Sequence, residues 1–243
     1  MISVCIATYN GARYIEAQIR SILPQLAQED EIIISDDGST DDTLRCIQQI
    51  ADDRIHVVSR LQPIGVTANF YAAMEKAKGD VIFLCDQDDV WLPNKVQRCM
   101  EGLKQYDMIV CDAQVVNADL QPLYPSLFAL IHSRSGLWHN WAFCSFYGSG
   151  MAFRRSVWEN AHPLPSGSLI AHDWWLGIVA EMTGKVCFLP ETLYLYRRHT
   201  NTVTQVNNRS LFTRSQRPWY IKITARIQML YYIILYRLTH RKP

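Results

Sequence analysis

The stretch "LCDQDDVWLPNK", Leu84–Lys95, decides the fold. An apolar run that begins at Val81 leads into three acids within four positions, and a tryptophan and a proline follow. A short continuous apolar run bounded by polar residues is typical of a buried strand. Unpaired carboxylates next to a low-dielectric interior cost free energy, and neighbouring carboxylates repel each other. The stretch therefore predicts a buried strand that ends at a site for a cation.

The same alternation of apolar run and helical stretch occurs five times in the first 120 residues. Continuous apolar strands separated by helices predict an α/β fold with a Rossmann-like, mostly parallel central sheet and helices on both faces. The predicted strands are "ISVCIATYN" from Ile2, "EIIISDD" from Glu31, "RIHVVSR" from Arg54, "DVIFLCD" from Asp80 and "DMIVCDAQVV" from Asp107.

Unusual polar residues follow three of these strands. Because ligands bind at the carboxyl ends of strands in open α/β sheets, these residues are expected to share one edge. They are Thr8-Tyr9-Asn10, Asp36-Asp37-Gly38-Ser39 and Asp86-Gln87-Asp88-Asp89. The glycine-rich loops GxGxxG and GxxxxGK[ST], which cradle phosphates through the backbone, are absent from the sequence. A nucleotide at this edge would therefore be held through a metal and cationic side chains.

The alternation fades after residue 120. Residues 121–128 look like a loop, residues 146–161 like a strand and a helix, and residues 168–184 like an apolar helix with a His-Asp pair near its start. "KVCFLPETLYLYRRH", residues 185–199, predicts two strands separated by a break at Pro190.

Charge is distributed unevenly along the 243 residues. The first 191 residues carry 14 Lys and Arg and 23 Asp and Glu, whereas the remainder carries ten Lys and Arg and no acid. We therefore expect a main domain over 1–205 and a basic, amphipathic helical tail over 206–243. The apolar run Met229–Tyr236 is too short to span a bilayer. Basic residues around an apolar stripe favour an interfacial helix on anionic lipid, with packing on the domain or dimerisation as alternatives.

The seven cysteines are scattered, with no CxxC pair, so neither a zinc site nor a disulfide framework is expected. The N-terminus begins with a strand pattern and not with a signal peptide. The net charge of +1 does not predict nucleic-acid binding. These features favour a cytoplasmic protein, peripheral on the inner face of the membrane through its tail.

Six motifs in this order resemble family 2 glycosyltransferases, which have the so-called GT-A fold. The resemblance covers roughly residues 1–205, and its details look most like the bacterial rhamnosyltransferase branch of surface polysaccharide assembly. The motifs are "TYN" from Thr8, "SDDGSTDDT" from Ser35, "CDQDD" from Cys85, "GSGMAFRR" from Gly148, "HDWWL" from His172 and "YRRHTNT" from Tyr196.

The resemblance implies a divalent cation, Mg²⁺ or Mn²⁺, in the Asp-x-Asp segment. Hard cations prefer carboxylate oxygen and bridge to phosphates. Asp88 is the expected main ligand and His199 a late metal or phosphate ligand. Asp86 is expected to reach the sugar or ribose, and Asp89 is a candidate cap for the following helix.

The nucleotide is implied to lie against the first two strand ends. Asp37 matches the position that recognises a uracil or thymine base, and Thr8, Tyr9 and Asn10 line the same pocket. Asp36 is more simply explained as a turn-stabilising residue. Arg197 or Arg198 would grip the diphosphate, with surface charge as the alternative for both.

Asp173 matches the general base of the family, with an N-cap role as the alternative. This chain has His172 where many relatives have Glu, which leaves the role of that position open. On the acceptor side the resemblance implies Gly150, with Gly148, Arg154 and Arg155 nearby. Trp174 and Trp175 are candidates for a sugar-stacking wall, with core packing as the alternative.

The implied function is an inverting, metal-dependent transfer of a hexosyl or deoxyhexosyl group from a UDP- or dTDP-sugar to a saccharide acceptor. A polyprenyl-linked acceptor in O-antigen or capsule synthesis fits the expected membrane contact. One alternative is a nucleotidyltransferase, although the stretch after the first strand lacks the basic, glycine-rich loop such an enzyme needs. The other is a non-catalytic sugar- or nucleotide-binding module, and the joint presence of Asp37, Asp88 and Asp173 argues against it.

Overall fold

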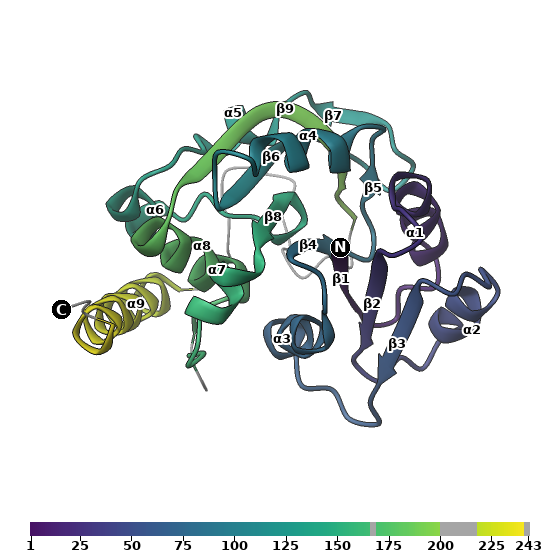
Figure 1. The fold of residues 1–243 in the computed structure, drawn as a ribbon, viewed down its shortest axis with the longest axis horizontal. Coiled ribbons are helices and arrows are strands. Elements are labelled where there is room, and N and C mark those ends of the chain that lie inside the picture. The colour runs from purple at the N-terminus through teal and green to yellow at the C-terminus, as the bar shows by residue number, and fades with distance from the viewer. Residues whose placement is uncertain (166–168, 200–217, 241–243) are drawn as a thin grey trace.

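A single mixed sheet forms the centre of the protein in the computed structural model, which describes residues 1–165, 169–199 and 218–240 (Figure 1). The strand order is β3-β2-β1-β4-β8-β6-β9-β5, and β7 pairs with β6. The predicted fold class, a mostly parallel α/β sheet with helices and a C-terminal helix, is confirmed. The strands are β1 Ile2–Thr8, β2 Glu31–Asp36, β3 Ile55–Ser59, β4 Val81–Asp86, β5 Val90–Trp91, β6 Met108–Val116, β7 Pro122–Tyr124, β8 Met151–Arg154 and β9 Val186–Arg197.

The parallel half of the sheet consists of β3, β2, β1 and β4, and the five strands predicted in the first 120 residues are these four and β6. The register aligns Thr8 with Asp36 on one side of β1 and Ala7 with Asp86 on the other. The polar strand ends therefore meet at one edge, as the sequence predicts.

The other half of the sheet is mixed. β8 is antiparallel to both β4 and β6, and β6 in turn is parallel to β9. The alternation of strands and helices predicts crossover connections, but it does not reveal where a later strand inserts between two earlier ones.

Two local predictions in the later part of the chain are wrong. β9 continues through Pro190, because a bulge absorbs the proline: Leu189 pairs with Cys111, and the next paired residue is Thr192, opposite Asp112. The stretch predicted as a loop over residues 121–128 contains β7 and the first turn of α5.

Helices cover the sheet on both faces and define two cores. On β1, Val4 and Ile6 face the core that holds α1, α2 and α4, whereas Cys5 faces the core that holds α3, α7 and α8. All seven cysteines are free thiols, as expected. The helices are α1 Ile15–Ile22, η1 Leu23–Gln25, α2 Thr43–Gln48, α3 Val66–Lys76, α4 Lys95–Gly102, α5 Leu127–Ile131, α6 Leu137–Phe143, η2 Gly148–Gly150, α7 Arg155–Asn160, α8 His172–Thr183 and α9 Trp219–Thr239.

The C-terminal helix α9 packs on the domain. Ala225, Met229, Ile233 and Tyr236 join the core beside α8. The indole N–H of Trp141 also donates to the Arg226 carbonyl at 2.9 Å. Domain packing, one of the three alternatives for the tail, is therefore present. The expected boundary near residue 205 lies outside the described residues.

The opposite face of α9 is also apolar but exposed. Its side chains recur every three or four residues, which places them in one stripe. They are Trp219, Ile223, Ile227, Tyr231, Ile234 and Leu238. Within the described ranges, no helix combines the length and hydropathy needed to cross a membrane.

Substitutions on the two faces of α9 should have unequal effects on stability. Met229 is fully buried, whereas Ile227 is 63% exposed. Met229→Ala is expected to lower the free energy of unfolding by about 2–4 kcal/mol through lost burial and a cavity. Ile227→Ala, the matched control, should change it by less than about 0.5 kcal/mol. Urea unfolding of both variants measures the difference, and equal effects would show that α9 does not dock.

Candidate functional site

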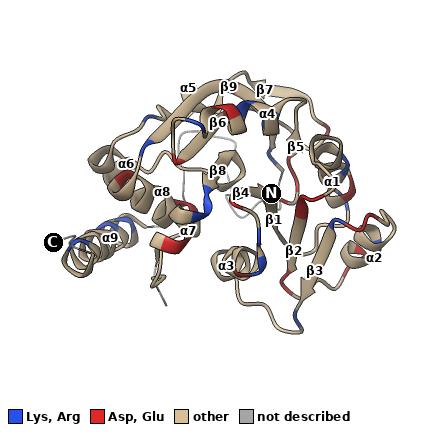
Figure 2. Ribbon diagram, viewed as in Figure 1, with Lys and Arg blue, Asp and Glu red and all other residues tan. Residues whose placement is uncertain are grey.

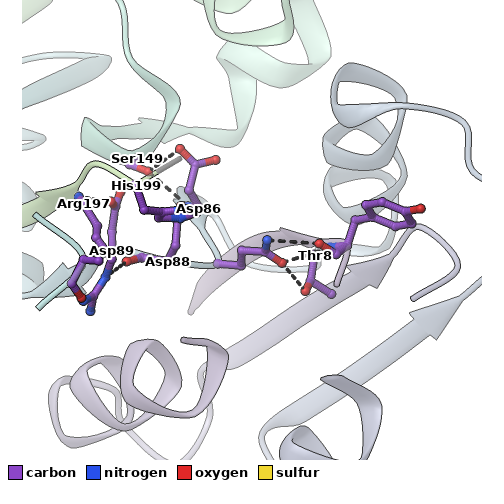
Figure 3. A network of polar contacts seen from close by, with 10 residues as sticks. Thr8, Asp86, Asp88, Asp89, Ser149, Arg197 and His199 are labelled. Carbon is purple, nitrogen blue, oxygen red and sulfur yellow. Dashed lines mark hydrogen bonds and ion pairs between the residues drawn. The ribbon is translucent and has the colours of Figure 1, made fainter. Parts of the chain in front are cut away.

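The acids at the end of β4 each have a different protein partner (Figure 3). Asp86 contacts Ser149, Asp88 contacts His199, and Asp89 contacts Arg197. These partners come from η2, from the residues after β9 and from the end of β9. Segments more than 60 residues away in the chain therefore converge on the acidic cluster.

Asp86 is held by the turn η2. The Ser149 hydroxyl donates to Oδ2 of Asp86 at 2.8 Å, and the Asp86 N–H donates back to that hydroxyl oxygen at 3.0 Å. Burial, reinforced by the charge of Asp88, raises the pKa of the Asp86 carboxyl from 3.8 to about 7. A negative charge on Asp86 next to that of Asp88 is therefore unfavourable unless a cation is bound.

Asp88 is the acid whose carboxylate meets another candidate metal ligand. Its Oδ2 lies 2.9 Å from Nε2 of His199, and the two side chains are 15% and 14% exposed. The His199 ring also contacts the Tyr14 ring, with centroids 4.8 Å apart. Asp88 and His199, the two metal ligands that the family resemblance implies, therefore lie side by side. The remaining "TNT" of that motif lies outside the described residues.

Asp89 is buried and accepts the Arg197 N–H at 3.0 Å. Burial and the neighbouring charges raise its pKa well above the usual range. Its suggested role as a helix cap is wrong, because α4 begins later, after Asn94 in a left-handed conformation. Asp89 instead ties the end of β9 to the end of β4.

The two arginines after β9 differ in their surroundings. The Arg197 side chain is buried, and its guanidinium donates to the main-chain carbonyls of Asp88 and Ala118. Its planar group also lies over the Tyr14 ring at 4.6 Å. The Arg198 guanidinium lies over the Tyr196 ring at 5.2 Å. Arg197 is thus used to fix the loop that carries Asp88.

A buried lysine lies behind the cluster. Lys95 is fully buried, and its Nζ donates to the Ser149 carbonyl at 2.6 Å. The ammonium group also lies 4.4 Å from the Trp91 ring centroid and 4.3 Å from that of Tyr194. Its positive charge lowers the pKa of Asp86, against the larger effect of burial. Lys95 therefore supplies an internal counter-charge and supports the turn that holds Asp86.

Gln87 joins the β4 end to the β1 end. Its Oε1 accepts the Thr8 hydroxyl at 2.6 Å and the Tyr9 N–H at 2.9 Å, and its Nε2 donates to the Tyr9 carbonyl. A Cβ on Gly11 would lie 2.2 Å from Oε1 of Gln87, so a larger residue there would displace the Gln87 side chain from these contacts. The Asn10 side chain accepts the Thr40 N–H. The Tyr9 side chain is exposed above this edge.

The β2 end carries the two acids expected to flank a base. Asp36 accepts the N–H groups of Gly38 and Ser39, which is the turn-stabilising role expected for it. Asp37 is buried and accepts the N–H groups of Ile64 and Gly65, at 2.8 and 2.9 Å. Asp37 therefore anchors the loop before α3, and each oxygen keeps one further acceptor site.

Asp173 lies in the first turn of α8 and accepts the N–H of Trp174 at 2.7 Å. The N-cap position itself belongs to Ala171. Burial is the main cause of the raised pKa values of Asp86 and of Tyr71 in α3, and the charge of Asp173 adds to both. The carboxylate therefore acts electrostatically on the acidic cluster from a position next to Gly148 of the turn η2.

The predicted acceptor side is only partly supported by the structure. Trp174 and Trp175 are buried, and their indole N–H groups donate to the carbonyls of Asn140 and Ala161. The structure therefore shows core packing, the alternative interpretation, and no stacking wall. A Cβ on Gly150 would lie 2.8 Å from the Cys111 carbonyl, so the backbones approach closely there.

Arg154 and Arg155 are not on the acceptor side, and that interpretation is wrong. Arg154 pairs in the sheet with Val81, at the start of β4 and far from the Asp86 end. The Arg155 guanidinium donates to the carbonyls of Ala77 and Gly79, before β4 begins. Both arginines stabilise the opposite edge of the sheet.

The residues present fit a divalent cation held jointly with a substrate. Within the described ranges, no group of three His, Cys, Asp or Glu residues is arranged around a common metal position. Mg²⁺ is commonly bound through one or two carboxylates together with substrate phosphates and water. Asp88, adjacent to His199, provides such an incomplete set, whereas Asp86 and Asp89 are held by other partners.

Three residues that organise this site were given no role from the sequence: Gln87, Lys95 and Ser149. Each acts through a contact between segments distant in the chain. The sequence offered one signal, a lysine at the start of the helix that follows the acidic cluster. A cavity of about 520 Å³ lies between α1 and the residues after β5, and none of the strand-end acids lines it.

The sequence matches the family model described as "Glycosyl transferase family 2" over residues 3–160. An uncharacterized glycosyltransferase of Nostoc sp. is 33% identical over 82% of this chain and 65% of its own length. A dTDP-rhamnosyl transferase of Shigella flexneri is 26% identical over 83% of this chain and 74% of its own. An Escherichia coli protein named UDP-Glc:α-D-GlcNAc-diphosphoundecaprenol β-1,3-glucosyltransferase is 38% identical over 40% of this chain and 38% of its own.

Solved structures show the same fold. Staphylococcus aureus TarS 1–349, in complex with UDP-GlcNAc, has a TM-score of 0.66 at 18% identity over 82% of this chain and 58% of that one. A Pyrobaculum calidifontis mannosyltransferase in complex with GDP-Man and Mn²⁺ has a TM-score of 0.61 at 18% identity, over 80% and 56%. The chain spans slightly less than two thirds of the length of the Nostoc relative. The same holds for a Mycobacterium bovis protein that is 27% identical over 89% of this chain.

Removing the Ser149 hydroxyl should disturb the acidic cluster. Ser149→Ala leaves a buried N–H and a carboxylate oxygen of Asp86 without their partner. We expect a loss of about 1–3 kcal/mol in the free energy of unfolding. Ser156→Ala, at an exposed position in α7, is the matched control and should be neutral. Thermal unfolding of both variants is the measurement, and a neutral Ser149→Ala would contradict the described network.

Proposed function

Because the chain belongs to glycosyl transferase family 2, we propose that it transfers a hexosyl or deoxyhexosyl group from a UDP- or dTDP-sugar to a saccharide acceptor, with inversion and with the help of a divalent cation. One observation carries the proposal. Among the described residues, Asp88 is the one acid at the end of β4 whose carboxylate pairs with a second metal-ligating side chain, His199, while Ser149 and Arg197 hold Asp86 and Asp89.

The donor would lie along the edge formed by the ends of β1, β2 and β4. Asp88 and His199 would hold the cation, which when bound supplies positive charge to the leaving diphosphate. Asp86 would accept hydroxyl groups of the sugar or ribose. Arg198 is the better candidate for contact with the diphosphate, because Arg197 already donates to two main-chain carbonyls.

The base of the nucleotide would lie against the β1 and β2 ends. Asp37 would accept an imide N–H of uracil or thymine with an oxygen that also anchors the loop before α3. Thr8 and Asn10 shape this pocket through their contacts with Gln87 and Thr40. The exposed ring of Tyr9 is available to stack on the base. A base without an imide N–H would leave the buried Asp37 carboxylate without its partner, and the site would therefore reject it.

Asp173 would act on the acceptor. A direct displacement with inversion needs one base that removes the proton of the attacking hydroxyl. The carboxylate of Asp173 acts electrostatically on Asp86 and is partly exposed at the start of α8. The name of the E. coli relative includes a diphosphoundecaprenol-linked saccharide acceptor, which supports a polyprenyl-linked saccharide as the acceptor here. Such an acceptor would fit O-antigen or capsule synthesis. Gly150 would allow close approach on that side.

Substitution of Asp88 and Asp173 should separate donor binding from turnover. Asp173→Asn is expected to lower the release of UDP or dTDP from a nucleotide sugar by about 10²–10⁴-fold, because the base is lost. Its affinity for the donor should stay within twofold of the original. Asp88→Asn should weaken Mn²⁺-dependent donor binding itself. The measurements are calorimetric donor binding and steady-state release of the diphosphate.

Asp80→Asn, at an exposed position at the other end of β4, is the control and should leave both quantities unchanged. A turnover of Asp173→Asn equal to that of the original protein would contradict the proposed role of the base.

The exposed face of α9 supports a peripheral position on the cytoplasmic face of the membrane. The helix α9 has two apolar faces, and the described residues of the domain cover one of them. Figure 2 shows Lys and Arg on α9 and no acidic residue. Sequence after residue 191 carries ten basic residues and no acid. Apolar contact combined with positive charge favours anionic lipid as the occupant of the exposed face.

Charge substitutions on this face should abolish vesicle binding without unfolding the protein. Ile227 and Tyr231 are both more than half exposed, so Ile227→Glu/Tyr231→Glu leaves the core contacts of α9 intact. We expect the original protein to sediment with vesicles of phosphatidylglycerol and phosphatidylcholine, and the variant to stay in solution. Leu61→Glu, at a position that is 96% exposed before α3, is the control.

Two outcomes would contradict the membrane proposal. One is equal sedimentation of the original protein and the variant. The other is a concentration-dependent dimer that the same two substitutions dissociate, because the apolar face would then be covered by a second copy of the chain.

A further inference from the structure

His172, the first residue of α8, is a buried histidine without a hydrogen-bond partner in the part of the chain that the structure describes. It is 6% exposed, and neither ring nitrogen has a partner among the described residues. Its ring stacks on Phe70 with the centroids 4.0 Å apart. Buried polar groups are nearly always hydrogen-bonded, and an unsatisfied one costs free energy. The unpaired imidazole of His172 therefore lowers the stability of the folded chain, which points to a role other than stability.

The His172 ring lies between the turn η2 and the helix α3, and both elements contact the strand ends at which the nucleotide sugar is proposed to bind. A Cβ built on Gly148 would lie 3.1 Å from Nε2 of His172, so this nitrogen faces the turn η2. The next residue of that turn, Ser149, holds Asp86. On its other side, the stacked Phe70 follows Asn69, whose side chain donates to the carbonyls of Thr8 and Ser35 at the β1 and β2 ends.

A second group with the same property lies nearby. The hydroxyl of Tyr71 in α3 also lacks a partner among the described residues, and burial, reinforced by the charge of Asp173, raises its pKa. Burial lowers the pKa of His172, which keeps the imidazole neutral at pH 7. A neutral imidazole carries one donor and one acceptor, which matches a sugar hydroxyl that both accepts and donates.

We propose that His172 hydrogen-bonds a hydroxyl of the transferred sugar and thereby selects the donor. The inference rests on the proposed function, since it needs a nucleotide sugar at the strand edge. A site that hydrogen-bonds a substrate hydroxyl discriminates strongly against analogues without it, because its buried polar group is then left unpaired. His172 thus determines specificity beside Asp173, which acts on the acceptor.

The test compares binding of the sugar with binding of the bare nucleotide. Calorimetry with Mn²⁺ gives the Kd values for UDP and dTDP and for UDP-glucose, UDP-N-acetylglucosamine and dTDP-rhamnose. For the nucleotide sugar that the original protein binds most tightly, His172→Phe should weaken binding about tenfold, from loss of one buried hydrogen bond. Binding of the matching diphosphate should change by less than twofold. His172→Gln, which keeps a donor and an acceptor, should restore most of the affinity.

Thermal unfolding supplies a second readout that a structural role would not give. Because His172→Phe removes an unpaired buried polar group and keeps an aromatic ring against Phe70, its unfolding midpoint should stay the same or rise. His56→Phe, at an exposed position on β3, is the control for histidine replacement and should leave both Kd values unchanged.

The outcomes separate this inference from the function on which it rests. If the original protein binds a nucleotide sugar and His172→Phe binds it equally well, the role of His172 is refuted and the proposed function stands. The same holds if His172→Phe weakens the bare diphosphate as much as the sugar. If the original protein binds neither UDP nor dTDP nor any of the three nucleotide sugars in the presence of Mn²⁺, the proposed function is refuted, and the role of His172 with it.

Discussion

The repulsion among Asp86, Asp88 and Asp89 is the constraint on which the rest of the site depends. Burial and mutual charge raise the pKa of Asp86 to about 7 and that of Asp89 well above its usual range. Without a cation, the folded chain keeps a proton on Asp86 that the unfolded chain would release near pH 3.8. The folded state therefore binds more protons between these values, and the cluster costs stability as the pH rises through that window. Positive charge at the cluster would remove this cost.

The surrounding structure is arranged to hold these acids apart. Lys95 supports the turn that carries Ser149, and Ser149 fixes Asp86. The backbone of Arg197 fixes Asp89, while the Arg197 side chain fixes the carbonyl of Asp88. These contacts leave the Asp88 carboxylate beside His199. The mixed half of the sheet serves the same edge, because η2, directly before β8, supplies Ser149, and the end of β9 supplies Arg197 and the following His199.

The sequence allowed the parallel half of the fold to be predicted, because continuous apolar runs and helical spacing are local signals. It also placed Thr8, Asp36 and Asp86 on one edge, since strand ends in a parallel sheet coincide. The insertion of β8, the bulge at Pro190 and the partners of Asp89 could not be predicted, because they depend on pairing between distant segments. Trp174 and Trp175 show the same limit: their residue type fits a sugar wall or a core, and only the packing of α7 and α9 decides for the core.

The central claim is that the acidic cluster binds a cation together with a nucleoside diphosphate. The most direct measurement is calorimetric titration of the purified protein with UDP, dTDP and GDP, each with and without Mn²⁺. The account predicts that UDP or dTDP binds in the presence of Mn²⁺, that chelation of the metal abolishes the binding, and that GDP binds more weakly because Asp37 faces a different base edge. Equal binding with and without Mn²⁺, or no binding of any of the three, would contradict it.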